Sequence, residues 1–231
     1  MKFSIPICKI RFHENKYTAW YISQVSSIQS LVLYPLQIHQ HRIDIESMKI
    51  IIGAGETQYP GWINTQQDQL DLLKSCSFEK ICRKGTVDCF LAEHVWEHLT
   101  IQQGKIAAKN CFEYLKPGGY LRVAVPDKNF KNEWYQNLVK VGGPGPKDHP
   151  AATHKVVYGH KELTSLLKSV GFKTQRLEFC DKTGSFHYRY WNSSDGHIGR
   201  SYRYDTRNTN NNIQMVSLIV DAYKPLILKY Q

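Results

Sequence analysis

The sequence lacks a long hydrophobic run and lacks cysteines at metal-binding spacing. The longest apolar stretch near its start, residues 28–38, is interrupted by Pro35 and is too short to cross a bilayer. Residues 1–40 lack the order typical of a secretory signal, which is a basic start followed by an apolar core and a small-residue cleavage site. The six cysteines are scattered without a C-x-x-C pair, which argues against a zinc site. We therefore expect a cytoplasmic protein with reduced thiols and no membrane span.

The composition is that of a chain that buries a core, and its charge is unevenly distributed. Of 231 residues, 42% are hydrophobic and 22% are charged, which fits one globular domain with an appendage. The net charge is +10, and residues 100–176 contain thirteen Lys and Arg against five Asp and Glu. This excess indicates either an anionic partner, such as a nucleotide-linked sugar, a lipid phosphate or RNA, or a solvated helix face. The helical spacing of Lys105, Lys109 and Lys116 favours the solvated face.

Residues 1–47 do not share the periodic pattern of the rest of the chain. They mix aromatic residues, Ser-Gln stretches and isolated apolar pairs without helix caps. This pattern agrees with a small β-rich extension, with a poorly ordered leader, or with an upstream reading outside the working protein. The position of Met48 directly before the first clear strand supports the upstream reading. We place no functional residue in this N-terminal extension and expect the functional domain over residues 48–231.

The most regular part of the chain predicts a βαβ unit. Val87–Ala92 and Tyr120–Val125 are β-prone apolar runs, and the residues between them have helical apolar spacing. Thr100 and Gln103 have the form of a capping box, and Pro117-Gly118-Gly119 is expected to end the helix. The alternation of strands and helices along the chain indicates an α/β fold with a largely parallel sheet.

Polar residues follow both strands of this unit. Glu93 and His94 come directly after the first strand, and Asp127 follows the second. In an open parallel sheet, ligands bind in the crevice beyond the carboxyl ends of the strands. The unit therefore predicts where a binding site lies and leaves its ligand open.

An earlier strand, Lys49–Ile52, runs into the turn Gly53-Ala54-Gly55. Glycines suit positions where the backbone takes a positive φ or passes close to a ligand, and such turns bind nucleotides. The next glycine is Gly61, and the following strand is predicted to begin at Trp62. This spacing leaves little room for a helix whose N-terminus would hold the pyrophosphate of a dinucleotide. It favours a nucleoside ligand without phosphates over a nicotinamide cofactor.

Several motifs have an order and a spacing that are specific as a set. They are Gly53-Ala54-Gly55, Pro60-Gly61-Trp62-Ile63-Asn64, Ala92 to Leu99, Leu115 to Arg122, Val125-Pro126-Asp127 and Ser217 to Ala222. In these motifs the chain resembles the class I S-adenosylmethionine-dependent methyltransferases over residues 49–225. The resemblance implies an α/β, Rossmann-like methyltransferase fold whose sheet is largely parallel with an antiparallel last strand. It also implies S-adenosylmethionine as cofactor and methyl transfer to a small or medium acceptor, a saccharide or anionic metabolite being favoured.

The resemblance also implies which residues bind the cofactor. Gly53-Ala54-Gly55 would pass under its amino-acid part, Ala92-Glu93-His94 would line its far side, and Asp71 would lie near the adenine. The position that binds the ribose hydroxyls usually holds Asp or Glu, and here it aligns with Gln66. Gln66 lacks the charge, so Asp68, two residues on, is the alternative ribose ligand.

His94 and Asp127 are the two candidate catalytic bases. An imidazole titrates near neutral pH, and Asp127 stands at the end of the neighbouring strand. Either residue could instead orient the acceptor, because methyl transfer depends largely on the alignment of donor and acceptor. His94 and His98 could share a metal ion on one helix face. Local hydrogen bonding of Glu97 and His98 is favoured over this, so no metal is expected.

His154, Arg200 and Arg203 are expected to flank and bind the acceptor. Guanidinium groups bind phosphates and carboxylates bidentately. The alternative is that the arginines pair with Asp195 and Asp205 and order a long loop. Aromatic and basic residues together can also bind single-stranded nucleic acid by stacking. No known RNA-binding module is visible, so a small molecule is the favoured partner and nucleic acid the less favoured one.

Two other functions remain as alternatives. A nicotinamide-dependent oxidoreductase shares the topology, but the short connection after the first strand argues against it. A non-catalytic methyltransferase-like binding module is supported by the uncharged Gln66. The Asn/Asp-Pro-Pro-Tyr signature of enzymes that methylate amino groups of bases is absent, which argues against DNA adenine as acceptor.

Overall fold

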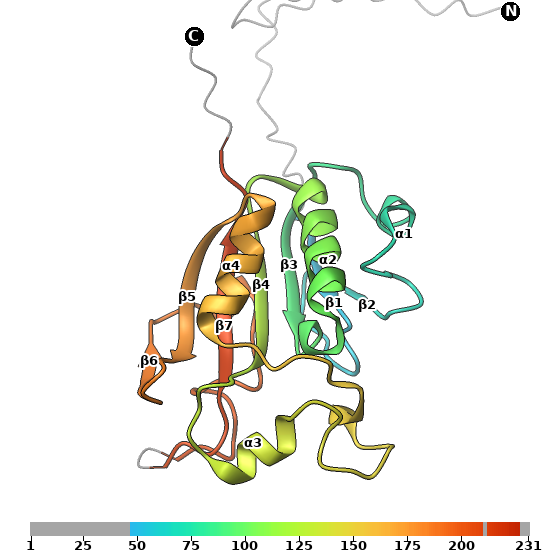
Figure 1. Ribbon diagram of the computed structural model, residues 1–231. Coiled ribbons are helices and arrows are strands. Elements are labelled where there is room, and N and C mark those ends of the chain that lie inside the picture. Colours follow the sequence, from blue (N-terminus) through green and yellow to red (C-terminus); the bar gives the residue numbers. More distant parts are fainter. Residues whose placement is uncertain (1–46, 210–211, 227–231) are drawn as a thin grey trace, which may run out of the picture. The chain divides into compact units, whose positions relative to one another are not determined.

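The computed structural model describes residues 47–209 and 212–226, which form one seven-stranded sheet with helices (Figure 1). The N-terminal extension expected over residues 1–47 lies outside the described residues, apart from residue 47. The strands are β1 (Lys49–Ile52), β2 (Trp62–Thr65), β3 (Val87–Glu93), β4 (Leu115–Pro126), β5 (Lys173–Cys180), β6 (Phe186–Tyr188) and β7 (Ser217–Tyr223). The α-helices are α1 (Ser75–Glu79), α2 (Ile101–Tyr114), α3 (Glu133–Val139) and α4 (His160–Val170), and the short 3-10 helices are η1 (Trp96–His98), η2 (Pro150–Thr153) and η3 (Ser193–Asp195).

The strand order is β2-β1-β3-β4-β7-β5-β6. β1 pairs in parallel with β2 and β3, and β3 pairs in parallel with β4. β7, the last strand of the chain, lies antiparallel between β4 and β5, and β6 is antiparallel to β5. The expected α/β class, with a largely parallel sheet and an antiparallel last strand, is therefore confirmed.

The predicted βαβ unit is present as β3, α2 and β4. Thr100 caps α2, because its hydroxyl accepts a hydrogen bond from the Gln103 N–H at 3.2 Å while the Gln103 side chain accepts one from the Thr100 N–H at 3.0 Å. α2 ends at Tyr114, and β4 begins at the next residue. The expectation that Pro117-Gly118-Gly119 ends the helix was therefore wrong, because these residues already belong to β4.

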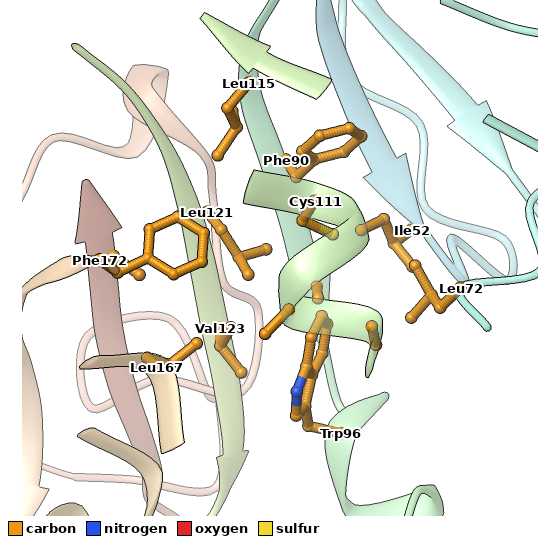
Figure 2. Close-up of a cluster of buried hydrophobic side chains, with 14 of the residues drawn as sticks. Ile52, Leu72, Phe90, Trp96, Cys111, Leu115, Leu121, Val123, Leu167 and Phe172 are labelled. Carbon is orange, nitrogen blue, oxygen red and sulfur yellow. The ribbon is translucent and has the colours of Figure 1, made fainter. Parts of the chain in front are cut away.

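The main hydrophobic core lies between the sheet and the helices α2 and α4, which cover one face of it (Figure 1). Figure 2 shows side chains of α2 such as Cys111 between Ile52 and Phe90 of the sheet and Trp96 of η1. Leu121, Val123, Leu167 and Phe172 continue this core towards α4. Fully burying one large apolar side chain contributes about 1.5–3 kcal/mol, so the burial of this layer strongly favours the packing of α2 and α4 on the sheet.

The second face of the sheet is covered by a long loop that follows β6. Trp191, Ile198 and Tyr204 of this loop, here named the cover loop (residues 189–207), pack on sheet residues that include Leu91 and Ile219. None of the described helices is long and apolar enough to cross a membrane. The cysteines of the described residues are free thiols.

A buried ion pair joins β4 and β7 beneath the cover loop. Arg122 and Asp221 face each other across the two strands, with Nε–Oδ1 and Nη2–Oδ2 distances of 2.7 and 2.8 Å. The remaining guanidinium nitrogen of Arg122 donates to the Gly196 carbonyl at 2.6 Å, and the guanidinium lies 5.0 Å from the ring centroid of Trp191. Each side chain is 2–3% exposed, so each charge relies on the other for compensation.

Replacing Arg122 with Met should leave the Asp221 carboxylate buried without its cation. Breaking a buried pair from one side costs about 3–5 kcal/mol, whereas replacing both partners with apolar side chains is close to neutral. We therefore expect Arg122→Met to lose far more unfolding free energy than Arg122→Met/Asp221→Leu in urea unfolding at neutral pH. A double variant as unstable as the single one would contradict this account.

Candidate functional site

Two cavities lie beyond the carboxyl ends of β1 and β3. The first, here named the turn cavity, has a volume of about 590 Å³, and the second, named the helix-side cavity, has about 530 Å³. Both are lined by Ile52, Gly53 and His94, so they adjoin at these residues. Their further linings include Ala54, Gly55, Thr57, Tyr59, Glu93 and Arg200 for the turn cavity and Gln67, Leu70, Asp71, Leu72, Val95, His98, Leu99 and Lys155 for the helix-side cavity.

The glycine turn forms the wall at which the two cavities adjoin. Gly53 and Gly55 have φ values of +60° and +56°, a region that favours glycine. A Cβ atom at Gly53 would also lie 3.0 Å from the Val95 side chain. The Ala54 N–H donates to the Thr65 carbonyl at 2.9 Å, which ties the turn to β2. Residues 53–61 contain no helix, in agreement with the short spacing of the sequence.

The side chain of Gln66 forms hydrogen bonds to this turn and lines neither cavity. Its Oε1 accepts from the Gly55 N–H at 3.2 Å, and its Nε2 donates to the Gly55 carbonyl at 2.7 Å. The next residue, Gln67, lines the helix-side cavity, while Asp68 is exposed and lines neither cavity. The sequence reasoning missed Gln67 because motif alignment does not tell which way side chains point once β2 has ended.

Asp71 lies where the resemblance places an acid, in the lining of the helix-side cavity beside Leu70 and Leu72. Its carboxylate accepts from the Leu73 N–H at 3.0 Å and pairs with Lys74 at 2.9 Å. These two contacts hold the pKa of Asp71 below its usual value, so the side chain is ionised at neutral pH. Ala92 packs in the main core and lines neither cavity.

Glu93 lines the turn cavity and also holds the cover loop. Its two carboxylate oxygens accept from the backbone N–H groups of Gly199 and Arg200 at 3.1 and 2.8 Å. Tyr59 lines the same cavity, and burial together with the charge of Glu93 raises the pKa of Tyr59 to about 12. The Tyr59 hydroxyl therefore remains protonated and can donate a hydrogen bond.

His94 stands at the junction of the two cavities with a φ of +55°, a conformation that costs a non-glycine residue about 1–3 kcal/mol. Its Nε2 lies 3.0 Å from the Ser217 hydroxyl, which itself donates to the Arg200 carbonyl at 2.6 Å. Because that hydroxyl has only one hydrogen, Nε2 of His94 must be the donor. Nε2–H therefore points at Ser217 and carries a proton.

The other ring nitrogen of His94, Nδ1, lies 3.1 Å from Oε1 of the fully buried Glu97. Burial acts to raise the pKa of Glu97, but the neighbouring His94 outweighs it, so that pKa lies below its usual value. Both ring nitrogens of His94 therefore face protein side chains, Nε2 facing Ser217 and Nδ1 facing Glu97.

Asp127 lines neither cavity. It is fully buried, and its carboxylate accepts from the backbone N–H groups of Asn129 and Cys180 at 2.8 and 2.6 Å. Burial raises the pKa of Asp127 to about 6, although these two hydrogen bonds oppose the shift. The structure therefore does not bring Asp127 to Glu93 and His94, and it gives this residue the role of joining the ends of β4 and β5.

The three predicted acceptor ligands are dispersed. Arg200 lines the turn cavity. Arg203 is held within the cover loop, where it donates to the Trp191 carbonyl at 3.0 Å and the Tyr204 hydroxyl at 2.8 Å. His154 is buried and lines neither cavity, and its ring lies against His98. Arg203 orders the loop through these contacts and not through the ion pairs with Asp195 or Asp205 that the alternative expected, since Asp205 pairs with Arg207 at 2.6 Å.

Comparisons with known proteins give a distant structural likeness. No family model matches the chain, and no curated protein matches its sequence. An S-adenosylmethionine-dependent methyltransferase from Thermotoga maritima has a TM-score of 0.44 and 15% identity, covering 78% of this chain and 83% of its own. One from Methanosarcina mazei has 0.44 and 15%, covering 85% and 100%, and one from Archaeoglobus fulgidus has 0.45 and 13%, covering 77% and 86%. At these values the likeness assigns neither a function nor a residue role to this chain.

The buried carboxyl of Asp127 should make folding stability depend on pH. Its pKa of about 6 in the folded protein exceeds the value of about 4 in the unfolded chain, so the folded state binds this proton more tightly. The stability due to this group is present below the unfolded pKa and is lost as pH rises through the folded pKa.

Asp127→Asn removes this titration and keeps an acceptor oxygen. We expect the unfolding free energy of the native protein minus that of the variant to fall by about 2–3 kcal/mol from pH 4 to pH 7, measured by urea unfolding at each pH. A difference that stays constant over this range would show that Asp127 does not titrate in this way.

Proposed function

We propose that the chain is an S-adenosylmethionine-dependent methyltransferase whose cofactor lies across the glycine turn. The observation that carries this proposal is the pair of cavities that adjoin at Gly53 and His94, beyond the carboxyl ends of β1 and β3. Ligands of open α/β sheets bind in this position. The cofactor, when bound, would supply a sulfonium-activated methyl group.

The residues present fit such a group. Leu70, Leu72 and Val95 give the helix-side cavity apolar walls for a base, and Gln67 and ionised Asp71 offer hydrogen-bond partners for a ribose or an adenine amine. Gly53-Ala54-Gly55 exposes backbone in the turn cavity, where the amino-acid part would lie. We therefore assign ribose recognition to Gln67 or Asp71 rather than to Gln66, whose amide is used by Gly55.

The turn cavity offers polar groups that suit a hydroxyl-rich or anionic acceptor. Its charged lining side chains include Arg200, Glu56 and Glu93, and Tyr59 offers a hydroxyl donor. Each carboxylate oxygen of Glu93 accepts from one backbone N–H, and these contacts hold the loop that carries Arg200. We propose that Arg200 and Tyr59 position a saccharide or anionic metabolite while His94 contributes to the shape of the cavity.

One observation favours a second candidate, a non-catalytic binding module. The side chain at the usual ribose position is bonded to Gly55 in the described structure, which removes one cofactor contact. A nicotinamide-dependent oxidoreductase is less supported, since residues 53–61 provide no helix N-terminus for a pyrophosphate.

Calorimetric titration with S-adenosylhomocysteine and with NAD tests these candidates. We expect the full chain to bind S-adenosylhomocysteine and not NAD. Asp71→Asn should weaken this binding by about tenfold to a hundredfold, because a hydrogen bond to a charged group contributes about 1.5–3 kcal/mol. The amide keeps an acceptor for the Leu73 N–H, so the fold should be retained.

Asp68→Asn is the matched control, since Asp68 is exposed and lines neither cavity. Its affinity should equal that of the native protein. Binding of NAD alone would support the oxidoreductase, and binding of neither ligand would support the non-catalytic module. If Asp71→Asn and Asp68→Asn lost the same affinity for S-adenosylhomocysteine, Asp71 would not belong to the site.

A further inference from the structure

A second cluster of ligand-type side chains lies beside the junction of the two cavities. Glu97 and His98 come from η1 and His154 follows η2, and one donor atom from each lies within 4.8 Å of the others. The two segments are joined by the backbone, because the N–H groups of Lys155 and Val156 donate to the Glu97 carbonyl at 2.7 and 3.2 Å. The backbone of the fold therefore fixes the positions of the two segments that carry the cluster.

Glu97 is the unusual member of this cluster. Its carboxylate is fully buried, and neither oxygen has a hydrogen-bond partner among the described residues. His94 Nδ1 lies 3.1 Å from Oε1, and His154 Nε2 lies 3.9 Å from the same oxygen. A buried carboxylate with an unbonded oxygen is costly unless a further cation or donor compensates it.

The two histidines are oriented as metal-binding histidines commonly are. Nδ1 of His154 lies 2.9 Å from the Val139 carbonyl, which can only accept, so Nδ1 carries a hydrogen and Nε2 is the nitrogen that faces Glu97 and is placed to bind a metal ion. Nδ1 of His98 lies 2.7 Å from the Thr153 hydroxyl, whose own donor contact is to the Pro150 carbonyl at 3.5 Å. This arrangement leaves Nε2 of His98 free as a ligand, and outer hydrogen bonds of this kind fix the rings around bound metals.

We propose that Glu97, His98 and His154 bind one divalent transition-metal ion, Zn²⁺ by the nature of the donors. Two imidazoles and one carboxylate suit Zn²⁺ and its neighbours, whereas Ca²⁺ and Mg²⁺ prefer oxygen ligands. His94 Nδ1 lies 3.1 Å from Oε1 and gives the carboxylate an outer contact of the kind that ligating carboxylates have, while Oε2 has no partner among the described residues. His98 lines the helix-side cavity, so an ion can enter from there. This site does not depend on the proposed cofactor.

Metal titration of the full chain, after removal of bound metal with a chelator, tests the site. We expect calorimetry with Zn²⁺ to give one ion per chain. Co²⁺ should give visible absorption bands without the thiolate charge-transfer band of cysteine ligation. His98→Gln and His154→Gln should each weaken Zn²⁺ binding by about a hundredfold or more, since each removes a direct ligand and loss of an outer contact alone costs about tenfold to a hundredfold.

His187→Gln is the matched control. His187 also pairs with a carboxylate, Asp181 at 2.7 Å, but as an isolated exposed pair. Its Zn²⁺ affinity should equal that of the native protein. His98 is only half-buried, so His98→Gln should fold, and thermal unfolding without metal checks this.

A second measurement is independent of affinity. Zn²⁺ at a hundredfold excess over Kd should raise the unfolding temperature of the native chain by about 5–10 °C and leave that of His98→Gln unchanged. Absence of saturable binding to the native chain, a Zn²⁺ affinity in His98→Gln and His154→Gln equal to that of the native chain, or a thiolate band would each overturn the proposal.

Discussion

Charged side chains on the second face of the sheet hold the cover loop, and the shape of the turn cavity follows from that. Glu93 binds the loop at Gly199 and Arg200, Arg122 binds it at Gly196, and Glu178 accepts from the Trp191 indole and the Tyr202 N–H. Arg122 and Glu178 are buried while Glu93 is half-buried, so the contacts of Arg122 and Glu178 compensate a desolvation cost that would otherwise oppose folding. The loop is therefore fixed by the strands it covers.

This constraint connects stability and function at one residue. The Glu93 carboxylate that lines the turn cavity is the same group that positions the loop backbone carrying Arg200. His94, the next residue, reaches Ser217 with one ring nitrogen and Glu97 with the other. The junction of the two cavities is thus linked to β7, to the cover loop and to the buried Glu97 cluster. A change at any of them should alter the geometry of the site.

Much of the fold could be read from local sequence patterns. The capping box at Thr100, the apolar period of α2 and the β-prone runs of β3 and β4 act over a few residues, and the structure contains each of them. The short connection after β1 also predicted the helix-free turn. The boundary at Pro117 was misread, because a local helix-stop signal does not reveal that β4 has already begun to pair with β3.

The sequence by itself determined the α/β class, the glycine turn and the presence of polar residues at the strand ends, because spacing and residue type along the chain decide these. Only the tertiary structure decided which polar groups face a cavity. Asp127 follows the run of apolar residues in its strand as Glu93 does, yet its carboxylate accepts hydrogen bonds from the backbone N–H groups of Asn129 and Cys180. His154 reaches Glu97 through a backbone pairing between segments far apart in the chain. Such assignments depend on which backbone donors from distant segments lie beside each buried charge in the folded protein, and no local sequence pattern contains this information.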